Sequence, residues 1–410
     1  MTSKHPNRAL RAACAAAALA LASLGAQAAD KTLTVGISDA LSGGGAVYGL
    51  PQQRAIELAV EEINAAGGIA VGGDTYRIKT IAYDDKADPT EATNVVRKLI
   101  DRDNVKVLLG FCCSASGGAV ASFIGREDVL MLVGTAGARD ITAAGNANVF
   151  RTRPPGDYTG AAAGRYLYEK GVRNLGVLAV RDVALFTQYR EELIKAFTEA
   201  GGKVAAVETF GGHDRDMSSQ LTKLRALKPD AVFISGYVEQ AAFAYRQSKE
   251  LGMKMPRYGF SGGSEAQFLK VATNDQMEGV TDLLAVEFSV QALGSQNARR
   301  FAEAYKAKYK EEPTPNTAYA YDQVYVLRDA IRKAQSVDDV KKLIAAVRSL
   351  PVPSDVLLKY IPIDGKMFDE NGQAYISNGA FVWKGGKWTF AGELPSDAKA
   401  YSVYLRSLRK

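Results

Sequence analysis

Short apolar runs alternate with helical patterns along this chain, and residues 105–142 show the alternation most clearly. Val105–Leu109 and Val129–Val133 are too short for helices and each is closed by a glycine, which indicates two strands separated by one helix. A repeated strand-then-helix pattern is typical of a parallel sheet with helices on both faces. Ligands of such sheets bind at the carboxyl ends of the strands. The sequence therefore predicts an α/β fold with a crevice beside the turns that follow these two strands.

The turn at residues 110–116 brings backbone N–H groups and two serine hydroxyls to the start of a helix. A helix N-terminus attracts an anion because its first N–H groups lack partners and the helix dipole is positive there. We expect Ser114, the amide of its neighbour Cys113 and the turn Thr135-Ala136-Gly137 to hold the carboxylate of a small ligand. The alternative is a serine-rich turn that only caps the helix.

The strand-then-helix rhythm breaks near residues 150–155 and then resumes, which indicates a second α/β unit. The segment 281–289 and the prolines at 351 and 353 are predicted to carry the chain back between the two units. Two units joined by several crossings imply a hinge that closes on a ligand. The predicted lobe I comprises residues 29–150 with 286–356, and the predicted lobe II comprises residues 151–285 with 357–410.

The first 28 residues have the pattern of a secretory signal peptide. Three basic side chains precede the apolar run Ala12–Leu24, and the small residues Ala26-Gln27-Ala28 follow it. The apolar run has thirteen residues, fewer than the roughly 20 that a membrane-spanning helix needs. We therefore expect cleavage after Ala28 and a mature protein that is soluble outside the cytoplasm.

Charge and cysteine content exclude several classes of partner. Without residues 1–28 the chain has 48 basic and 45 acidic side chains, which indicates neither nucleic acid nor an anionic membrane as partner. The α-carbons of Cys112 and Cys113 are adjacent, ~3.8 Å apart, closer than the ~4.4–6.8 Å usual across a disulfide. We expect reduced thiols or a strained, labile bridge. These cysteines and the single mature histidine, His213, lack the spacing of metal ligands, so we expect neither a metal nor a cofactor.

Two motifs look catalytic but lack the residues that catalysis requires. Gly259-Phe260-Ser261-Gly262-Gly263 matches the G-x-S-x-G nucleophile elbow. The hydrolase order places a histidine base after the serine, whereas His213 precedes it. Gly43 and Gly45 partly match a dinucleotide fingerprint, but Tyr48 stands where the third glycine belongs. We therefore expect a binding protein without catalytic residues, and not an enzyme.

Six groups of residues carry a resemblance to a known family. They are Leu41-Ser42-Gly43 with Tyr48-Gly49, Tyr83-Asp84-Asp85 with Asp88-Pro89, Gly110 through Ser116, Asp216 through Leu221, Tyr321-Asp322, and Phe368 through Gly372. In this order they resemble the leucine/isoleucine/valine-binding proteins of bacterial ABC importers. The resemblance covers essentially the entire mature chain.

The resemblance implies a type I periplasmic binding protein, with two Rossmann-like lobes joined by three crossover segments. It further implies a monomer in the periplasm that closes on a small carboxylated solute and delivers it to the membrane permease of an ABC transporter. The ligand would be a branched-chain or related amino acid, or another carboxylate. The alternative is a ligand-sensing periplasmic receptor that reports to a signalling partner in the membrane.

The resemblance also assigns roles to individual residues. Ser114 resembles the serine whose hydroxyl and N–H hold the ligand α-carboxylate. Thr135 falls where a backbone carbonyl takes the α-ammonium, and Gly137 falls where the family often has a threonine. Tyr48 resembles the aromatic wall of the side-chain pocket, and Tyr237 the second-lobe tyrosine that closes over the ligand.

Departures from the family pattern concern the ligand more than the fold. Gly137 lacks the threonine hydroxyl, and the family's ammonium-binding acid should fall within Ser261–Glu265, where only Glu265 is acidic. A buried ammonium without its acid would be strongly unfavourable. A carboxylate without an α-amino group therefore competes with an aliphatic amino acid as the predicted ligand. Phe186, Tyr48 and Tyr237 could line an aromatic pocket for it.

Overall fold

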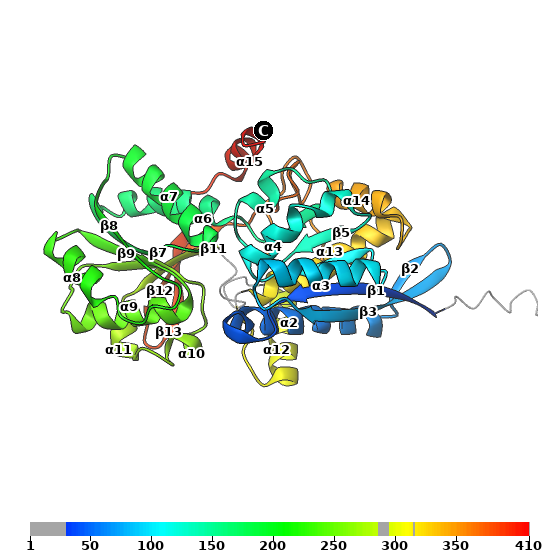
Figure 1. Ribbon diagram of the computed structural model, residues 1–410, viewed down its shortest axis with the longest axis horizontal. Coiled ribbons are helices and arrows are strands. Elements are labelled where there is room, and N and C mark those ends of the chain that lie inside the picture. Colours follow the sequence, from blue (N-terminus) through cyan, green and yellow to red (C-terminus); the bar gives the residue numbers. More distant parts are fainter. Residues whose placement is uncertain (1–29, 286–294, 315, 410) are drawn as a thin grey trace, which may run out of the picture.

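The computed structural model describes residues 30–285, 295–314 and 316–409, which form two α/β lobes side by side (Figure 1). Each lobe is built on its own sheet. The first sheet comprises β1 (Asp30–Asp39), β2 (Ile69–Val71), β3 (Asp74–Asp84), β4 (Val107–Gly110), β5 (Leu130–Val133) and β6 (Val149–Arg151). The second comprises β7 (Asn174–Val180), β8 (Lys203–Phe210), β9 (Ala231–Ser235), β10 (Arg257–Phe260), β11 (Thr281–Ala285), β12 (Asn378–Lys384) and β13 (Lys387–Glu393).

The first sheet has the strand order β2-β3-β1-β4-β5-β6 and is parallel except for the β2–β3 pair. The central strands β4 and β5 are buried at every position, as expected for parallel strands covered on both faces. These are the two strands that the runs at 105–109 and 129–133 predicted. Their carboxyl ends lie at one edge of the sheet, followed by the turns at 110–116 and 134–139.

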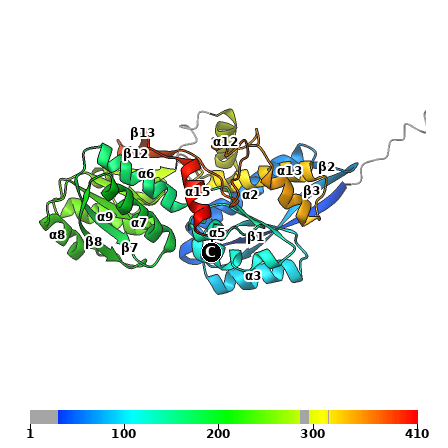
Figure 2. The same cartoon turned by 90° about the horizontal axis from the view of Figure 1, so that it is seen from above.

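Helices cover both faces of this sheet (Figures 1 and 2). They are α2 (Ala46–Ala65), α3 (Pro89–Asp101), α4 (Ser114–Ala121), α5 (Asp140–Ala143), α12 (Gln296–Tyr309), α13 (Thr317–Ala334) and α14 (Val340–Arg348), with 3₁₀ turns at Gly43–Gly45 and Ile124–Arg126. The start of α3 shows how local residues determine a helix end. The Asp88 side chain caps the helix by accepting the N–H groups of Thr90 and Glu91, and Pro89 occupies the first turn. In α2, Pro51 lies inside the helix, within its first two turns.

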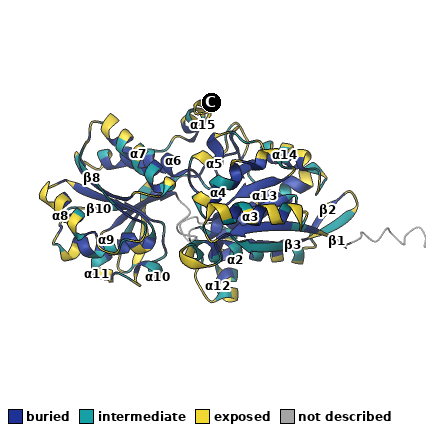
Figure 3. Ribbon diagram, in the orientation of Figure 1, coloured by how far each residue is buried: buried dark blue, intermediate teal, exposed yellow. Residues whose placement is uncertain are grey.

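The second sheet has the order β13-β12-β11-β10-β9-β7-β8. Strands β7 to β11 are parallel, and the hairpin β12–β13 adds antiparallel strands at one edge. The accompanying helices are α6 (Gly156–Glu169), α7 (Ala184–Glu199), α8 (Ser218–Ala226), α9 (Val238–Glu250), α10 (Glu265–Phe268) and α11 (Asn274–Met277). The β12–β13 hairpin turns at Gly385-Gly386. The lobe has its own core of buried side chains, centred on the strands (Figure 3).

The chain passes between the lobes after β6, after β11 and between Ile376 and Asn378. Ile376 packs in the core of the first lobe, whereas Asn378 begins β12 of the second sheet. The segment 286–294, predicted to contain part of a crossing, lies outside the described residues. Residues 357–376 pack in the first core, and Gln373 forms an isolated β-bridge with Arg151, the last residue of β6. We therefore propose that the last lobe boundary lies near residue 377, because the prolines at 351 and 353 turn the chain without taking it across.

The C-terminal helix α15 (Ala398–Ser407) lies where the two lobes meet (Figure 2). Its Tyr401 ring packs edge-on against Tyr158, with the ring centroids 5.3 Å apart. Its Tyr404 hydroxyl accepts a bond from Arg139 of the first lobe and donates one to Glu192 of α7. In the described part of the chain, none of the helices combines the length and the apolar character needed to cross a bilayer.

Candidate functional site

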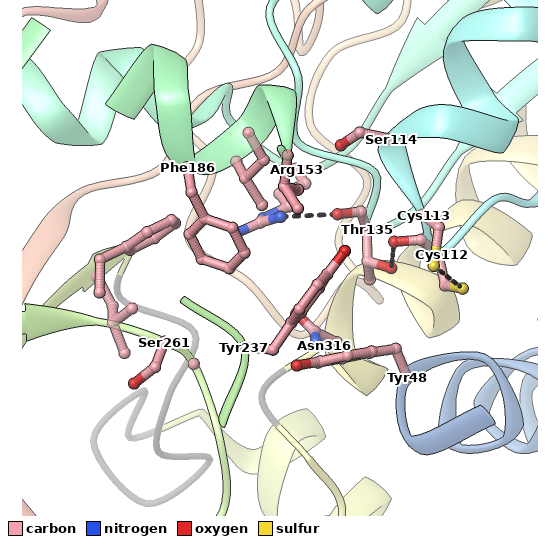
Figure 4. Close-up of a pocket in the computed structure, with 15 residues that line it drawn as sticks. Tyr48, Cys112, Cys113, Ser114, Thr135, Arg153, Phe186, Tyr237, Ser261 and Asn316 are labelled. Atoms are coloured by element: carbon pink, nitrogen blue, oxygen red, sulfur yellow. Dashed lines mark hydrogen bonds between the residues drawn. The ribbon is translucent and has the colours of Figure 1, made fainter. Parts of the chain in front are cut away.

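A cavity with about 600 Å³ of empty space, part of it open to solvent, lies between the two lobes at the carboxyl ends of β4 and β5 (Figure 4). The lining residues that the sequence had singled out as binding residues are Tyr48, Cys113, Ser114, Thr135, Phe186 and Tyr237. Those that it had not assigned to binding are Cys112, Arg153, Val183, Leu185, Phe260, Ser261, Gly262, Leu284 and Asn316. The turns predicted from residues 105–142 thus form part of the first-lobe side of the cavity.

Aromatic rings from both lobes meet at the cavity. Tyr48 of α2 and Tyr237, which precedes α9, have ring centroids 5.8 Å apart, and Phe186 of α7 packs edge-on against Tyr237 at 5.3 Å. The Tyr48 hydroxyl accepts a long bond of 3.5 Å from the Val238 N–H. Burial raises the pKa of Tyr237 to about 12. Tyr48 of the first lobe thus contacts Tyr237 and Val238 of the second lobe, while Phe186 packs against Tyr237 within the second lobe.

A buried carboxylate holds the turn that carries the first-lobe residues. Asp39, at the end of β1, accepts the Cys112 N–H at 2.7 Å and both of its oxygens lie within 2.8 Å of the Gln52 amide nitrogen. Burial raises the pKa of Asp39 to about 8. Gly110 opens the turn with φ of +108°, and a Cβ there would lie 2.7 Å from the Ser38 carbonyl oxygen. The position therefore requires glycine.

Ser114 begins α4 and links the two first-lobe turns. Its hydroxyl oxygen accepts the N–H groups of Gly137 at 3.2 Å and Ala138 at 3.1 Å. A hydroxyl has two acceptor positions and one proton to donate. Because both acceptor positions are occupied, the Ser114 hydroxyl can offer only its proton to a group in the cavity.

Arg153 places a guanidinium group in the cavity (Figure 4). Its Nη1 donates to the Thr135 carbonyl at 2.7 Å, while its Nε is buried without a hydrogen-bond partner among the described residues. Arg153 follows β6, so it also stands at the carboxyl end of a first-sheet strand. Its position after a predicted strand could have indicated Arg153 as a binding residue. The prolines that follow it, Pro154 and Pro155, made the segment resemble a linker between the two units.

The two adjacent cysteines are free thiols in the structure. Their sulfur atoms lie 3.0 Å apart, with Cys112 buried and Cys113 partly exposed to the cavity. The contact with Cys113 and burial together raise the pKa of the Cys112 thiol. Cys112 is therefore a neutral thiol at neutral pH.

Three predicted residues do not line the cavity. Ala136 is fully buried, with its N–H bonded to the Phe111 carbonyl. Gly137 lies behind the Arg153 guanidinium and contributes its N–H to Ser114. Glu265 accepts the Trp388 N–H of β13 at 3.1 Å, so its carboxylate is engaged with the outer hairpin. We therefore do not retain Glu265 in the candidate site.

The G-x-S-x-G serine lies in the cavity without a histidine beside it. The Ser261 hydroxyl donates to Asp282 at 2.7 Å, and the Tyr245 hydroxyl donates to the same carboxylate at 3.2 Å. Burial raises the pKa of Asp282 to about 6. None of the described lining residues is a histidine, an aspartate or a glutamate, and the described chain brings together no group of three potential metal ligands.

Two α/β lobes that line one cavity between them define a protein that encloses a small solute. Residues 32–386 match the model of a family described as periplasmic binding protein. The chain belongs to this family and has the type I fold. Members of the family are periplasmic and bind solutes, and they are not enzymes.

Three known proteins illustrate the relationship. The leucine-, isoleucine-, valine-, threonine-, and alanine-binding protein of Pseudomonas aeruginosa is 29% identical over 331 residues, covering 79% of this chain and 85% of that protein. A branched-chain amino acid transporter substrate binding protein from Streptococcus pneumoniae, solved with isoleucine, is 26% identical with a TM-score of 0.76 and covers 90% of this chain and 100% of that one. An ABC transporter solute binding protein from R. palustris, solved with benzoate, is 24% identical with a TM-score of 0.76 and covers 90% and 98%. At that identity the likeness concerns the fold alone.

Proposed function

We propose that this chain is the periplasmic solute receptor of an ABC importer. It closes its two lobes on a small carboxylated solute and presents the closed form, as a monomer, to a membrane permease. Cleavage after Ala28 would release it into the periplasm. The observation that carries the proposal is the cavity between the lobes, to which hydrogen-bond donors come from one lobe and aromatic rings from both.

The chemistry of the cavity supports a ligand with a negatively charged end. Ser114 has only its proton to offer, and Arg153 carries a permanent positive charge. The aromatic rings of Tyr48, Phe186 and Tyr237 provide an apolar surface for the remainder of the solute. Small-molecule sites commonly combine a mostly apolar lining with a few polar groups that orient the ligand.

A thermal-shift screen of the mature protein tests this proposal. The panel comprises aliphatic amino acids, aromatic carboxylates, dicarboxylates and the corresponding amides. A ligand that binds only the folded state raises the melting temperature, by an amount that corresponds to about 2.7 kcal/mol at a hundredfold excess over Kd. We expect at least one carboxylate to raise it and its amide to have little effect. No shift with any carboxylate would contradict the proposal.

Deletion of the gene tests the transport role separately. We expect the deletion strain to lose uptake of the ligand that the screen identifies. Normal uptake together with a lost response to that ligand would instead support the sensory alternative.

A further inference from the structure

We propose that the cavity selects an aromatic carboxylate that lacks an α-ammonium group, and that Arg153 binds its carboxylate. The inference rests on the proposed function and narrows its ligand to one chemical class. It is carried by the arrangement of Arg153, Thr135, Ser114 and Gly137, together with the aromatic rings around them.

Two of the polar groups that line the cavity from the first lobe, Arg153 and Ser114, present donors to it. Arg153 donates one N–H to the Thr135 carbonyl, and its Nε has no hydrogen-bond partner among the described residues. A guanidinium carries five N–H donors in a planar fork that matches a carboxylate. The Ser114 hydroxyl adds a further donor, because the N–H groups of Gly137 and Ala138 occupy both of its acceptor positions. A carboxylate bound here would accept from the Arg153 guanidinium and neutralise its charge.

Among the described lining residues, an α-ammonium group would find no carboxylate. The Thr135 carbonyl, which the family resemblance assigns to the ammonium, already accepts from Arg153. The Asp282 carboxylate behind Ser261 is fully buried and already accepts from Ser261 and Tyr245. An amino acid bound at this end of the cavity would place its ammonium beside the Arg153 cation. Like charges in a partly desolvated site repel each other strongly.

Gly137 makes the position of Arg153 possible. A Cβ at residue 137 would lie 2.5 Å from Nη1 and 3.1 Å from Cζ of Arg153. Any other residue at 137 would therefore push the guanidinium away from the place it occupies. The guanidinium of Arg153 can therefore occupy this place only because residue 137 is a glycine.

The walls of the cavity favour a flat ring. Tyr48, Phe186 and Tyr237 line it, and Phe186 also packs edge-on against Phe260, another lining residue, at 5.6 Å between centroids. Aromatic pairs in edge-to-face or offset geometry gain energy beyond that of simple apolar burial. An aryl carboxylate can make such contacts with its ring while its carboxylate reaches Arg153.

Isothermal titration calorimetry on the mature chain tests the ligand class with four probes: benzoate, cyclohexanecarboxylate, benzamide and L-leucine. We expect benzoate to bind most tightly. A charged hydrogen-bonded contact contributes enough that benzamide and L-leucine should each bind at least about tenfold more weakly. Cyclohexanecarboxylate, which keeps the charge but not the flat ring, should bind more weakly than benzoate.

Variants test the role of Arg153. Arg153→Met should weaken benzoate binding at least about tenfold and leave benzamide binding nearly unchanged. Arg153→Lys should restore part of the difference, because lysine keeps the charge without the planar fork. Gly137→Ala should weaken benzoate binding while Arg153 is still present. Arg126→Met, which removes an exposed arginine of the same lobe, is the control and should bind as the unmodified chain does.

Circular dichroism and the melting temperature show whether each variant folds, and if Arg153→Met does not, Arg153→Lys and Gly137→Ala decide the question. Tighter binding of L-leucine than of benzoate would overturn this inference and leave the proposed function intact. Equal binding of benzamide and benzoate, or Arg153 variants that fold and bind benzoate normally, would overturn it too. Equal binding of cyclohexanecarboxylate would overturn the aromatic part. If none of the four binds, the inference fails, whereas the proposed function fails only if the wider thermal-shift screen is also negative.

Discussion

At the scale of single residues, the candidate site depends on which hydrogen-bonding positions are already occupied. Ser114 could accept or donate in isolation, but in the fold its oxygen accepts two backbone N–H groups. The Thr135 carbonyl could accept from a ligand, but Arg153 occupies it. Because of these contacts, the Ser114 hydroxyl can only donate to a ligand, and the Thr135 carbonyl is already engaged. The negative charge that we predict for the ligand depends on these occupied acceptor positions more than on the residue types alone.

Replacing Ser114 tests whether its hydroxyl donates to the ligand carboxylate. In Ser114→Ala the N–H groups of Gly137 and Ala138 lose their acceptor and the cavity loses a donor. Hydrogen bonds to charged groups contribute roughly 1.5–3 kcal/mol each, so we expect carboxylate binding to weaken by at least several-fold, measured by calorimetry. The fold should persist, with a somewhat lower melting temperature. Unchanged affinity would remove Ser114 from the site.

At the scale of elements, the buried Asp39 joins β1 to α2 and to the turn that leads into α4. It accepts from Gln52 of α2 and from the N–H of Cys112, next to the cavity. Burial raises its pKa to about 8, whereas an aspartate in an unfolded chain ionises near pH ~3.9. The folded protein therefore retains a proton that the unfolded chain has lost across the range between these values.

This linkage predicts how stability depends on pH. Where the folded state binds more protons than the unfolded state, the free energy of unfolding falls as pH rises. The contribution of Asp39 is complete below about pH 4 and is lost as pH rises through about 8. Asp39→Asn does not titrate, so its melting temperature should fall less between pH 5 and pH 8 than that of the unmodified chain.

Two features of this experiment separate the contribution of Asp39 from that of other carboxyl groups. Asp282 and Asp322, whose pKa values burial raises to about 6 and about 7, remain in the variant, so the fall becomes smaller without vanishing. Asp128→Asn removes a carboxylate whose side chain is 63% exposed and serves as the control. An equal fall in Asp39→Asn and in the unmodified chain would contradict the assignment.

At the scale of the whole molecule, aromatic rings of different lobes lie in contact across the cavity. Tyr48 and Tyr237 touch across the cavity, and on the hinge side the α15 tyrosine Tyr404 connects Arg139 of the first lobe with Glu192 of α7. A ligand that binds the closed form more tightly shifts the lobes toward closure. We propose that the described structure is the closed form, because Tyr48 and Tyr237 are already in contact.

Small-angle X-ray scattering tests closure. A bound carboxylate should lower the radius of gyration of the unmodified chain. Tyr237→Ala removes the ring contact, and because aromatic pairs contribute about 0.5–1.5 kcal/mol beyond burial, the variant should need several-fold more ligand to reach the same compactness. Phe243→Ala, which removes an aromatic ring of α9 outside the cavity lining, provides a comparison. A radius of gyration that does not change at saturating ligand would contradict closure.

The sequence predicted those features of the fold and the cavity that depend on local patterns. The strands at 105–109 and 129–133 and the turn containing Ser114 follow from apolar runs and glycines within a few residues. Arg153 could not be predicted in the same way, because its place depends on how the chain leaves β6 and on the space at Gly137. Glu265 was selected as the only acid in its window, yet packing of the β12–β13 hairpin directs its carboxylate to Trp388. Helix α15 was not predicted from the sequence.

The central claim is that a carboxylate binds between the lobes at Arg153 and Ser114. The most direct test is a crystal structure of the mature protein with the carboxylate that gives the largest thermal shift. We expect its carboxylate oxygens within ~3 Å of the Arg153 guanidinium and the Ser114 hydroxyl, as charged hydrogen bonds require, with the remainder of the ligand against Tyr48, Phe186 and Tyr237. A ligand bound outside this cavity, or one whose carboxylate faces Ser261 while Arg153 makes no contact with it, would contradict the account.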